Sequence, residues 1–339
     1  MGTDKGTDME QRTLGRTGRQ VSVVGLGTWQ LGADWGDVSE ADATAVLEAS
    51  AEAGVTFFDT ADVYGDGRSE QLVGRFVAAH PDAGFTVATK MGRRAEQVPA
   101  SYVEASFREW LDRSRRNLGV DRIDLVQLHC PPSQVIDDDA TYDVLDRLVD
   151  DGVIAAYGVS VETAAQALSA IGRPHVASVQ IILNAFRMKP LDEVLPAASA
   201  AGVGIIARVP LASGLLSGKY DLDTTFAADD HRTYNRDGSA FDVGETFSGV
   251  DYATGVEAAQ EFSALVAATG LPDITPAQAA IAWAWQQPGV STVIPGARNV
   301  SQAQANAAAG RLHDLPVELL AGVSELYDRR VRAQVHDRW

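Results

Sequence analysis

Three apolar runs of this sequence each end in a residue that can carry a charge or a proton. The runs end at Asp59, Lys90 and His129, and Tyr64 follows the first of them within a glycine-bearing turn. Apolar runs that stop abruptly at polar or glycine residues are typical of buried strands. Ionisable side chains are costly to bury unless they pair, so the convergence of four of them favours a functional site over isolated helix caps and packing residues.

These four residue types together form a set that can donate a proton. The ordinary pKa of tyrosine is about 10, and a nearby cation lowers it; we expect Lys90 to be that cation for Tyr64. Asp59 would keep Lys90 charged, and His129 would hydrogen-bond and orient a substrate oxygen. The set has no nucleophile and no cluster of carboxylates for a metal. Reduction of a carbonyl group fits best, with hydride from a bound cofactor because no side chain supplies one.

Predicted strands and helices alternate along most of the chain. The predicted strands are residues 23–28, 55–59, 85–90, 123–129, 156–160, 178–180, 204–209 and 291–294. The predicted helices are residues 41–53, 69–79, 102–118, 140–150, 163–171 and 191–201, with another beginning near residue 301. Roughly eight such units close a parallel (β/α)8 TIM barrel, in which chemistry takes place at the carboxyl ends of the strands.

Four segments lie outside this alternation. Residues 1–10 form a polar tail, and residues 13–21 are expected to form a β-hairpin. Residues 218–254 are polar and too long for an ordinary connection, which predicts either a loop after the seventh strand that covers the mouth or a disordered segment. Residues 316–332 are expected to form an extra C-terminal helix outside the barrel. We predict one barrel domain over residues 11–339.

Composition and charge limit the classes of partner. Hydrophobic residues make up 45% and charged residues 22% of the 339, as in an ordinary globular protein. The net charge of −18 argues against binding to nucleic acid or to anionic membranes, and no apolar stretch reaches the roughly 20 residues needed to cross a bilayer. No signal-peptide core is recognisable, and a single cysteine suits a reducing compartment, so we expect a cytoplasmic protein. No surface pattern predicts the oligomeric state.

The one cysteine, Cys130, adjoins His129 and raises the idea of a thiol nucleophile. We disfavour this idea, because neighbouring residues on a strand point to opposite faces. A dinucleotide fingerprint is also incomplete, because Gln30 stands where the third glycine after Gly25 and Gly27 would be.

The chain resembles the aldo-keto reductase superfamily, in its bacterial NADP-dependent form, over almost its whole length. Each motif is weak alone, but their order is specific: Gly25–Trp29, Phe58–Gly65, Thr89–Lys90, Asp124–His129, Gly158–Ser160, Gln180, Pro210–Lys219 and Ile294–Arg298. The resemblance implies a (β/α)8 barrel that binds NADP(H) without a Rossmann domain. It also implies a catalytic tetrad of Asp59, Tyr64, Lys90 and His129, in which Tyr64 is the acid for reduction and the base for oxidation.

The resemblance assigns cofactor contacts residue by residue. Ser160 and Gln180 would hold the nicotinamide carboxamide, the Pro210–Lys219 segment would follow the pyrophosphate, and Arg298 would pair with the 2′-phosphate, which favours NADPH over NADH. A solvated surface arginine is the alternative for Arg298. The full expected set is Gly27, Thr28, Asp59, Ser160, Gln180, Arg208, Pro210, Leu211, Ser213, Gly214, Leu215, Lys219, Ile294, Gly296, Ala297, Arg298, Gln302 and Asn306, the last two facing the adenine.

Three positions depart from the family pattern. Arg208 stands where many members stack an aromatic ring on the nicotinamide, Val161 where many have Asn, and Ala305 where an acidic residue often contacts the adenine. These changes leave the tetrad intact and bear on the nicotinamide geometry and on the preference for NADP over NAD.

The substrate pocket is expected around Trp29, Tyr64 and His129. The aromatic residues Trp35, Tyr234, Phe241 and Phe247 would either line it or pack within the loops. Aldehydes, ketones, sugars and pyridoxal-type rings all remain open as the small-molecule carbonyl substrate.

Three rival functions remain. A metal-dependent hydrolase or isomerase would need histidines at several strand ends, but of six histidines only His129 ends a predicted strand. The resemblance extends to potassium-channel beta subunits, which implies the alternative of a cofactor-binding sensor that acts through a partner. The same residues would also serve an alcohol dehydrogenase working in the oxidative direction.

Overall fold

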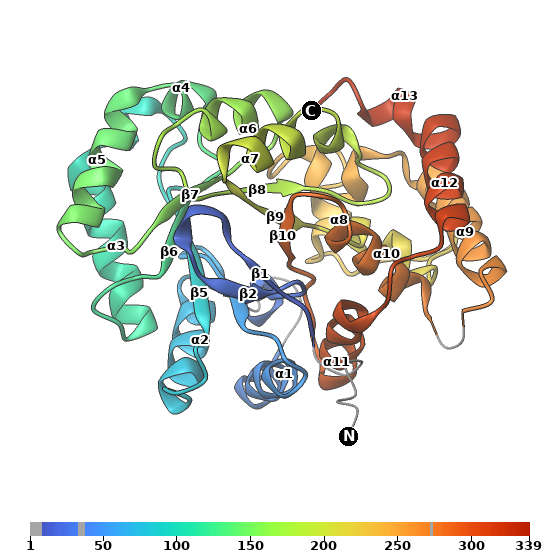
Figure 1. The fold of residues 1–339 in the computed structure, drawn as a ribbon, viewed down its shortest axis with the longest axis horizontal. Coiled ribbons are helices and arrows are strands. Elements are labelled where there is room, and N and C mark those ends of the chain that lie inside the picture. Colours follow the sequence, from blue (N-terminus) through green and yellow to red (C-terminus); the bar gives the residue numbers. More distant parts are fainter. Residues whose placement is uncertain (1–8, 33–37, 272–273) are drawn as a thin grey trace.

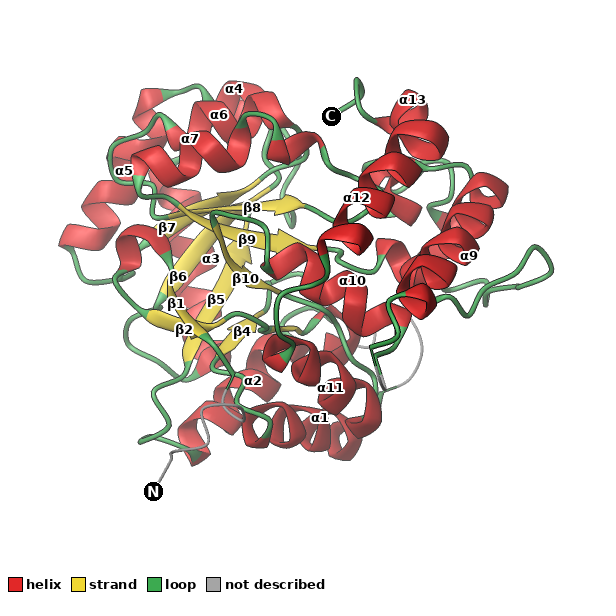
Figure 2. Ribbon diagram, turned by 45° about the vertical axis from the view of Figure 1, so that its right-hand side comes forward, coloured by secondary structure: helices red, strands yellow, loops and turns green. Residues whose placement is uncertain are grey.

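Eight parallel strands with helices around them make up the body of the computed structural model, which describes residues 9–32, 38–271 and 274–339 (Figures 1 and 2). The strands pair in chain order: β3 (Leu26–Gly27), β4 (Phe57–Asp59), β5 (Thr86–Met91), β6 (Leu125–His129), β7 (Tyr157–Ser160), β8 (Ser178–Ile182), β9 (Gly204–Arg208) and β10 (Val290–Val293). Two parallel bridges, Val24 with Val293 and Gly27 with Gly296, join the last strand to the first. The predicted (β/α)8 barrel is confirmed.

The first strand is shorter than predicted. We expected residues 23–28, but only Leu26 and Gly27 pair with β4. The residues before them turn toward β10 instead, since Gly25 N donates to Val293 O at 2.8 Å and Val293 N donates to Val23 O at 2.9 Å. This segment therefore closes the barrel.

Helices cover the outside of the sheet (Figure 2). They include α1 (Glu40–Glu52), α2 (Arg68–Ala79), α3 (Glu104–Leu118), α4 (Ser133–Ile136), α5 (Asp139–Asp150), α6 (Ala164–Ile171), α7 (Val194–Ala201) and α11 (Val300–Ala308). Local sequence fixes several of their starts: Thr163 and Gln166 form a capping box on α6. In the part of the chain that the structure describes, no helix combines the length and the apolar character needed to cross a membrane.

Two helices lie where the sequence analysis assigned no element. These are α9 (Tyr252–Ala268) and α10 (Pro276–Trp285), between β9 and β10. Every residue of α10 from Ala279 to Trp285 is buried. A helix that is apolar all round has no amphipathic stripe, so helical periodicity could not reveal it.

The amino end of the barrel is closed by the predicted hairpin, β1 (Gln11–Thr13) and β2 (Gln20–Ser22). Its Leu14 and Val21 join a small apolar cluster with the strand residues Phe57, Leu125 and Ile206. Apolar packing therefore fills this end and leaves the carboxyl end as the place for polar residues.

The other two predicted additions are also present. The extra C-terminal helix is α12 (Val317–Leu326), which packs on α9 outside the barrel and continues through a wider turn into α13 (Arg332–Val335) (Figures 1 and 2). The long loop after β9 has defined structure, with α8 (His231–Tyr234) inside it and Phe247 and Ser248 buried near its end. Of the two expectations for this segment, the structure therefore shows an ordered loop.

Candidate active site

The four predicted catalytic residues meet at the carboxyl ends of adjacent strands. Asp59 is the last residue of β4, Lys90 lies near the end of β5 and His129 ends β6. Tyr64 lies in the turn between β4 and α2. Because parallel strands end at the same edge, this placement follows from the strand alternation that the sequence predicted.

Lys90 connects the set. Its Nζ donates to a carboxylate oxygen of Asp59, to the carbonyl oxygen of Thr60 at 2.9 Å and to the Tyr64 hydroxyl at 3.2 Å. The second oxygen of Asp59 accepts hydrogen bonds from Gln127 Nε2 at 3.0 Å and Gln180 Nε2 at 2.8 Å. Lys90 and Asp59 are both buried, so a dense set of hydrogen bonds compensates their desolvation.

Sequence reasoning missed Gln127, although strand periodicity contains the signal for it. Gln127 lies two residues before His129 on β6, so both side chains point into the barrel. Gln180 was expected to hold the nicotinamide carboxamide, but here its amide nitrogen is engaged with Asp59.

The site shifts the pKa values of its members. Burial lowers the pKa of Lys90, but Asp59 and Tyr64 outweigh it and the net pKa is raised. Burial raises the pKa of Tyr64, and the opposing effect of Lys90 is smaller, so the expected net lowering is wrong for this state. Burial and the nearby cations, first Arg93, hold the pKa of His129 well below its usual value. Tyr64 is therefore protonated and His129 neutral near pH 7, and both can donate a hydrogen bond.

Aromatic rings lie next to the tyrosine. Trp29 stacks on Tyr64 with ring centroids 6.2 Å apart, and it contacts His231 and Phe241 of the long loop at 5.2 and 6.0 Å. The ring of His129 meets that of Tyr64 edge-on at 6.0 Å. The three expected pocket residues are thus brought together, and the long loop reaches them.

The remaining aromatic candidates divide between pocket and packing. Tyr234 contacts Phe241 at 6.2 Å, on the side of the loop that reaches Trp29. Phe247 is buried against Phe226 and Tyr252, so it packs within the loop. Trp35 lies outside the described residues.

The segment after β9, expected to follow the pyrophosphate, has an unusual backbone. Val209, Ala212, Ser213 and Gly214 all have positive φ values, between 47° and 98°. Turns that mix left- and right-handed residues direct successive N–H groups to one side and suit anions, so the donor chemistry of this segment fits a diphosphate. Pro210 and Leu211 lie within this turn.

The other expected cofactor residues differ in burial and in their contacts within the chain. The side chain of Thr28, fully buried, donates to Asp59 O at 2.9 Å. Leu215 is also fully buried, at a point where Gly255 of α9 has no room for a side chain. Lys219 is exposed, and Ser160 Oγ lies 3.5 Å from Cys130 Sγ.

The turn from Ile294 to Arg298 leads into α11, as expected. Arg298 N donates to Gln302 Oε1 at 2.9 Å, and Asn306 Nδ2 donates to Gly296 O at 3.0 Å, so both side chains help to hold the turn. The guanidinium of Arg298 is partly exposed and lies 3.9 Å from Asp230 of the long loop. Ala297 is buried within the turn. A helix N-terminus with an adjacent arginine fits a phosphate group.

A second group of charges, which sequence reasoning missed, lies at the same mouth. Arg93 donates to Glu162 Oε1 at 3.1 Å and to Glu245 Oε1 at 2.7 Å. Arg208 donates to Glu162 Oε2 at 2.9 Å and lies 3.7 Å from Glu245 Oε2. We call these four residues the arginine–glutamate cluster. Arg208 was expected only as a cofactor contact, and this pairing had no signal in the sequence because its partners lie in separate loops.

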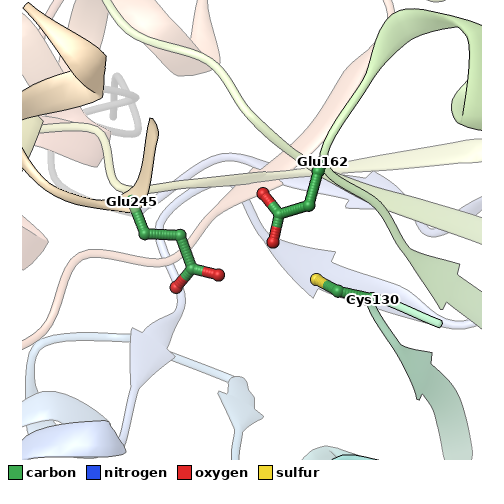
Figure 3. A group of neighbouring side chains, drawn as sticks. All are labelled: Cys130, Glu162 and Glu245. Carbon is green, nitrogen blue, oxygen red and sulfur yellow. The ribbon is translucent and has the colours of Figure 1, made fainter. Parts of the chain in front are cut away.

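Cys130 lies beside this cluster, contrary to the expectation that it points away from the mouth. It follows β6 with a φ of 49°, so it has left the strand, and Figure 3 shows its thiol directed toward Glu162 and Glu245. Burial raises the pKa of the thiol to about 12, so it stays protonated. A protonated thiol is a poor nucleophile, so this role stays disfavoured, although for a different reason than the one expected.

By distance alone, Cys130, Glu162 and Glu245 could surround a metal ion, since their ligand atoms lie within 4.8 Å of one another (Figure 3). The guanidinium groups of Arg93 and Arg208, however, already pair with both carboxylates. Two cations at this position repel a third, so the group suits an internal ion-pair cluster better than a metal site.

Burial and the like charge of Glu245 raise the pKa of Glu162 to about 7, although Arg208 and Arg93 oppose the shift. The pKa of Glu245 is held well below its usual value, since Arg93 and Arg208 outweigh the effect of burial. Glu245 is thus the permanent anion of the cluster.

Known proteins resemble this chain over nearly its whole length. An uncharacterised oxidoreductase of Mycobacterium tuberculosis is 34% identical over 301 residues, which cover 86% of this chain and 84% of that protein. The structure of a glycerol dehydrogenase from Gluconobacter oxydans matches with a TM-score of 0.75 and 28% identity, covering 96% of this chain and 97% of the other. An aldo-keto reductase from Klebsiella pneumoniae in complex with NADPH matches with a TM-score of 0.68 and 25% identity, covering 94% and 95%.

The family model described as the aldo/keto reductase family matches residues 23–328. That range runs from the residues that close the barrel to the helix packed outside it, and it includes all four predicted catalytic residues. This chain belongs to the aldo/keto reductase family.

Proposed function

We propose that this protein reduces the carbonyl group of an aldehyde or ketone to an alcohol with NADPH, in a reversible reaction. The observation that carries the proposal is the position of Lys90, which hydrogen-bonds the Tyr64 hydroxyl at 3.2 Å while paired with the buried carboxylate of Asp59. This arrangement holds a cation against a protonated phenol. Such a phenol can give up its proton only when a basic oxygen develops nearby.

The protein's own residues would handle the proton and the orientation of the substrate. Tyr64 donates its proton to the carbonyl oxygen, and Lys90 stabilises the phenolate that forms. Asp59 keeps Lys90 charged throughout. His129 is neutral and donates a second hydrogen bond to the same oxygen, which places the carbonyl carbon for attack. The bound nicotinamide would supply the hydride.

NADPH is the proposed cofactor for two reasons. The Klebsiella pneumoniae relative is described in complex with NADPH. In this chain Arg298 lies at the N-terminus of α11 with part of its side chain exposed, where an arginine can pair with a 2′-phosphate. The turn after β9 would contribute backbone donors to the diphosphate.

Oxidation of an alcohol is the second candidate. It is favoured by the structural similarity to a glycerol dehydrogenase. The raised pKa of Tyr64 bears on direction, because the same residue must be deprotonated to act as a base. We therefore expect reduction to dominate near neutral pH and oxidation to require a higher pH. A sensor that binds cofactor and acts through a partner remains as the third alternative.

The test is a fluorescence titration of the purified protein with NADPH and NADH, followed by addition of a panel of aldehydes and ketones. Tight NADPH binding and its oxidation by a carbonyl compound would support the reductase. Binding without turnover on any carbonyl or alcohol would favour the sensor. Absence of binding by either nucleotide would contradict the proposal.

A further inference from the structure

One buried hydroxyl group ties the first turn of α2 to the ends of two barrel strands. It belongs to Ser69, which is fully buried. Ser69 Oγ accepts a hydrogen bond from Thr60 Oγ1 at 2.9 Å and lies 2.8 Å from Thr28 Oγ1. It also donates to Thr28 O at 3.0 Å. Because Thr28 follows β3 and Thr60 follows β4, this hydroxyl joins two neighbouring strand ends to the helix.

Both threonines contact the catalytic residues in turn. Thr28 Oγ1 donates to Asp59 O at 2.9 Å. Thr60 O accepts a hydrogen bond from Lys90 Nζ at 2.9 Å. The hydroxyl of Ser69 is therefore separated from Lys90 by one residue, Thr60, and from Asp59 by one residue, Thr28. Buried hydrogen bonds that are linked in this way restrict one another's positions.

The turn that carries Tyr64 ends at the same serine and has an uncommon backbone. Gly65, Asp66 and Gly67 have positive φ values of 59°, 52° and 94°. This conformation is unfavourable for a residue with a side chain, such as Asp66, so contacts at the ends of the turn must hold it. At the helix end, Ser69 N donates to Tyr64 O at 3.2 Å. The position of the Tyr64 backbone thus depends on that of Ser69.

The next residue, Glu70, anchors the same helix turn to a third strand. Glu70 is fully buried, and its carboxylate accepts hydrogen bonds from Thr89 Oγ1 at 2.6 Å and Asn117 Nδ2 at 2.8 Å. Thr89 lies on β5, directly before Lys90. The start of α2 is therefore fixed against the strands that hold the catalytic residues. The 3.2 Å contact between the Tyr64 hydroxyl and Lys90 Nζ spans this fixed frame.

We propose that Ser69 is a positioning residue, whose hydroxyl holds Thr60 and the turn after β4 so that the Tyr64 hydroxyl stays in contact with Lys90. Its effect on turnover rests on the proposed reduction, whereas the contacts belong to the protein without substrate. Proton transfer is sensitive to such positioning, because a displacement of about 1 Å can lower a rate about 100-fold. Ser69 itself takes no part in the transfer.

The first test is kinetic and uses Ser69→Ala, which leaves the buried Thr60 hydroxyl without this acceptor. We expect kcat to fall about tenfold, while KM for the carbonyl substrate and the affinity for NADPH change by less than about twofold. A weaker contact with Lys90 would leave Tyr64 with a higher pKa. The pH at which alcohol oxidation reaches half of its maximal rate should therefore rise.

A second variant removes the same hydrogen bond from its other side. Thr60→Val keeps the shape of the side chain and should lower kcat by a similar factor. The double variant should be no slower than the slower single variant, because both changes break one contact. The matched control is Ser50→Ala on α1, whose buried hydroxyl donates to Val46 O at 2.7 Å and should leave every rate unchanged.

A third measurement needs no turnover. The sequence has four lysines, so single arginine replacements of Lys5, Lys189 and Lys219 identify the ammonium NMR signal of Lys90 by elimination. In Ser69→Ala and Thr60→Val we expect this signal to shift and its protons to exchange faster with solvent. In Ser50→Ala it should not change.

The outcomes separate the positioning role from the proposed function. Unchanged kcat in both Ser69→Ala and Thr60→Val would overturn the positioning role. A fall in kcat without a shift of the pH profile or of the Lys90 signal would overturn it as well, and so would losses that multiply in the double variant. If the wild type reduces no carbonyl compound, the proposed function fails, and the Lys90 signal still decides whether Ser69 holds this site.

Discussion

Two groups of charged side chains share the carboxyl mouth of this barrel, and they are built in opposite ways. Asp59 and Lys90 lie on neighbouring strands, are buried, and are joined to Tyr64 by one hydrogen bond. The arginine–glutamate cluster joins Arg208, the last residue of β9, to three residues from separate loops, one of which is Glu245 from the long loop. The first group has geometry fixed by the sheet, as proton transfer requires. The second depends on the long loop for one of its four members, Glu245.

We expect the largest effect from a change in the strand-built group of Asp59, Lys90 and Tyr64. Tyr64→Phe removes the proton donor and keeps the ring, so we expect turnover to fall by at least about 100-fold while NADPH affinity changes little. Steady-state rates and a fluorescence titration on the same preparation measure both. Turnover close to that of the wild type would remove Tyr64 from the mechanism.

Lys90→Met tests the same group through stability. It leaves the Asp59 carboxylate buried with the side-chain amides of Gln127 and Gln180 as its partners, which should cost about 3–5 kcal/mol of unfolding free energy. Adding Asp59→Asn in the double variant should recover part of this loss, because no unpaired charge then remains. Urea unfolding curves give the values. A double variant less stable than Lys90→Met alone would show that the pair is not the source of the cost.

Arg298→Ala is expected to have a smaller, selective effect. Loss of a charge-assisted contact to the 2′-phosphate should weaken NADPH binding by about tenfold and leave NADH nearly unchanged. Arg329→Ala, which removes an exposed arginine paired with Glu261, is the control. Equal losses for both nucleotides would argue that Arg298 does not recognise the 2′-phosphate.

The smallest effect concerns a carboxyl group in the same turn as the tetrad. Asp62 is buried, and neither of its oxygens has a hydrogen-bond partner in the described residues. Burial, and secondarily Glu70, raises its pKa from 3.8 to about 7. The folded state therefore holds a proton that the unfolded chain releases, so stability falls as pH rises from about 4 to 7.

Asp62→Asn removes this titration. We expect its melting temperature to exceed that of the wild type by at least about 2 °C at pH 8 and to match it near pH 4. Thermal unfolding at the two pH values measures this. If the difference in melting temperature between variant and wild type does not change with pH, the raised pKa of Asp62 is wrong.

Residues at strand ends could be predicted from the sequence, whereas residues in the loops could not. Asp59, Lys90 and His129 each end an apolar run, so strand periodicity alone is enough to place them at one edge of the sheet. Glu245 lies in a polar loop with no periodicity, and its partners are 152 and 37 residues away, a pairing that only the folded chain reveals. The net pKa of Tyr64 was mispredicted because it depends on burial in the folded chain, which raises it, as well as on the nearest cation, which lowers it.

The most direct test of the proposed reaction uses NADPH deuterated at both C4 positions, with the wild type and Tyr64→Phe and the same carbonyl panel. We predict that an alcohol product carries a single deuterium on its carbinol carbon, and that Tyr64→Phe forms it at least about 100-fold more slowly. NADPH that binds without passing deuterium to any carbonyl compound, or equal transfer by both proteins, would contradict carbonyl reduction by this site.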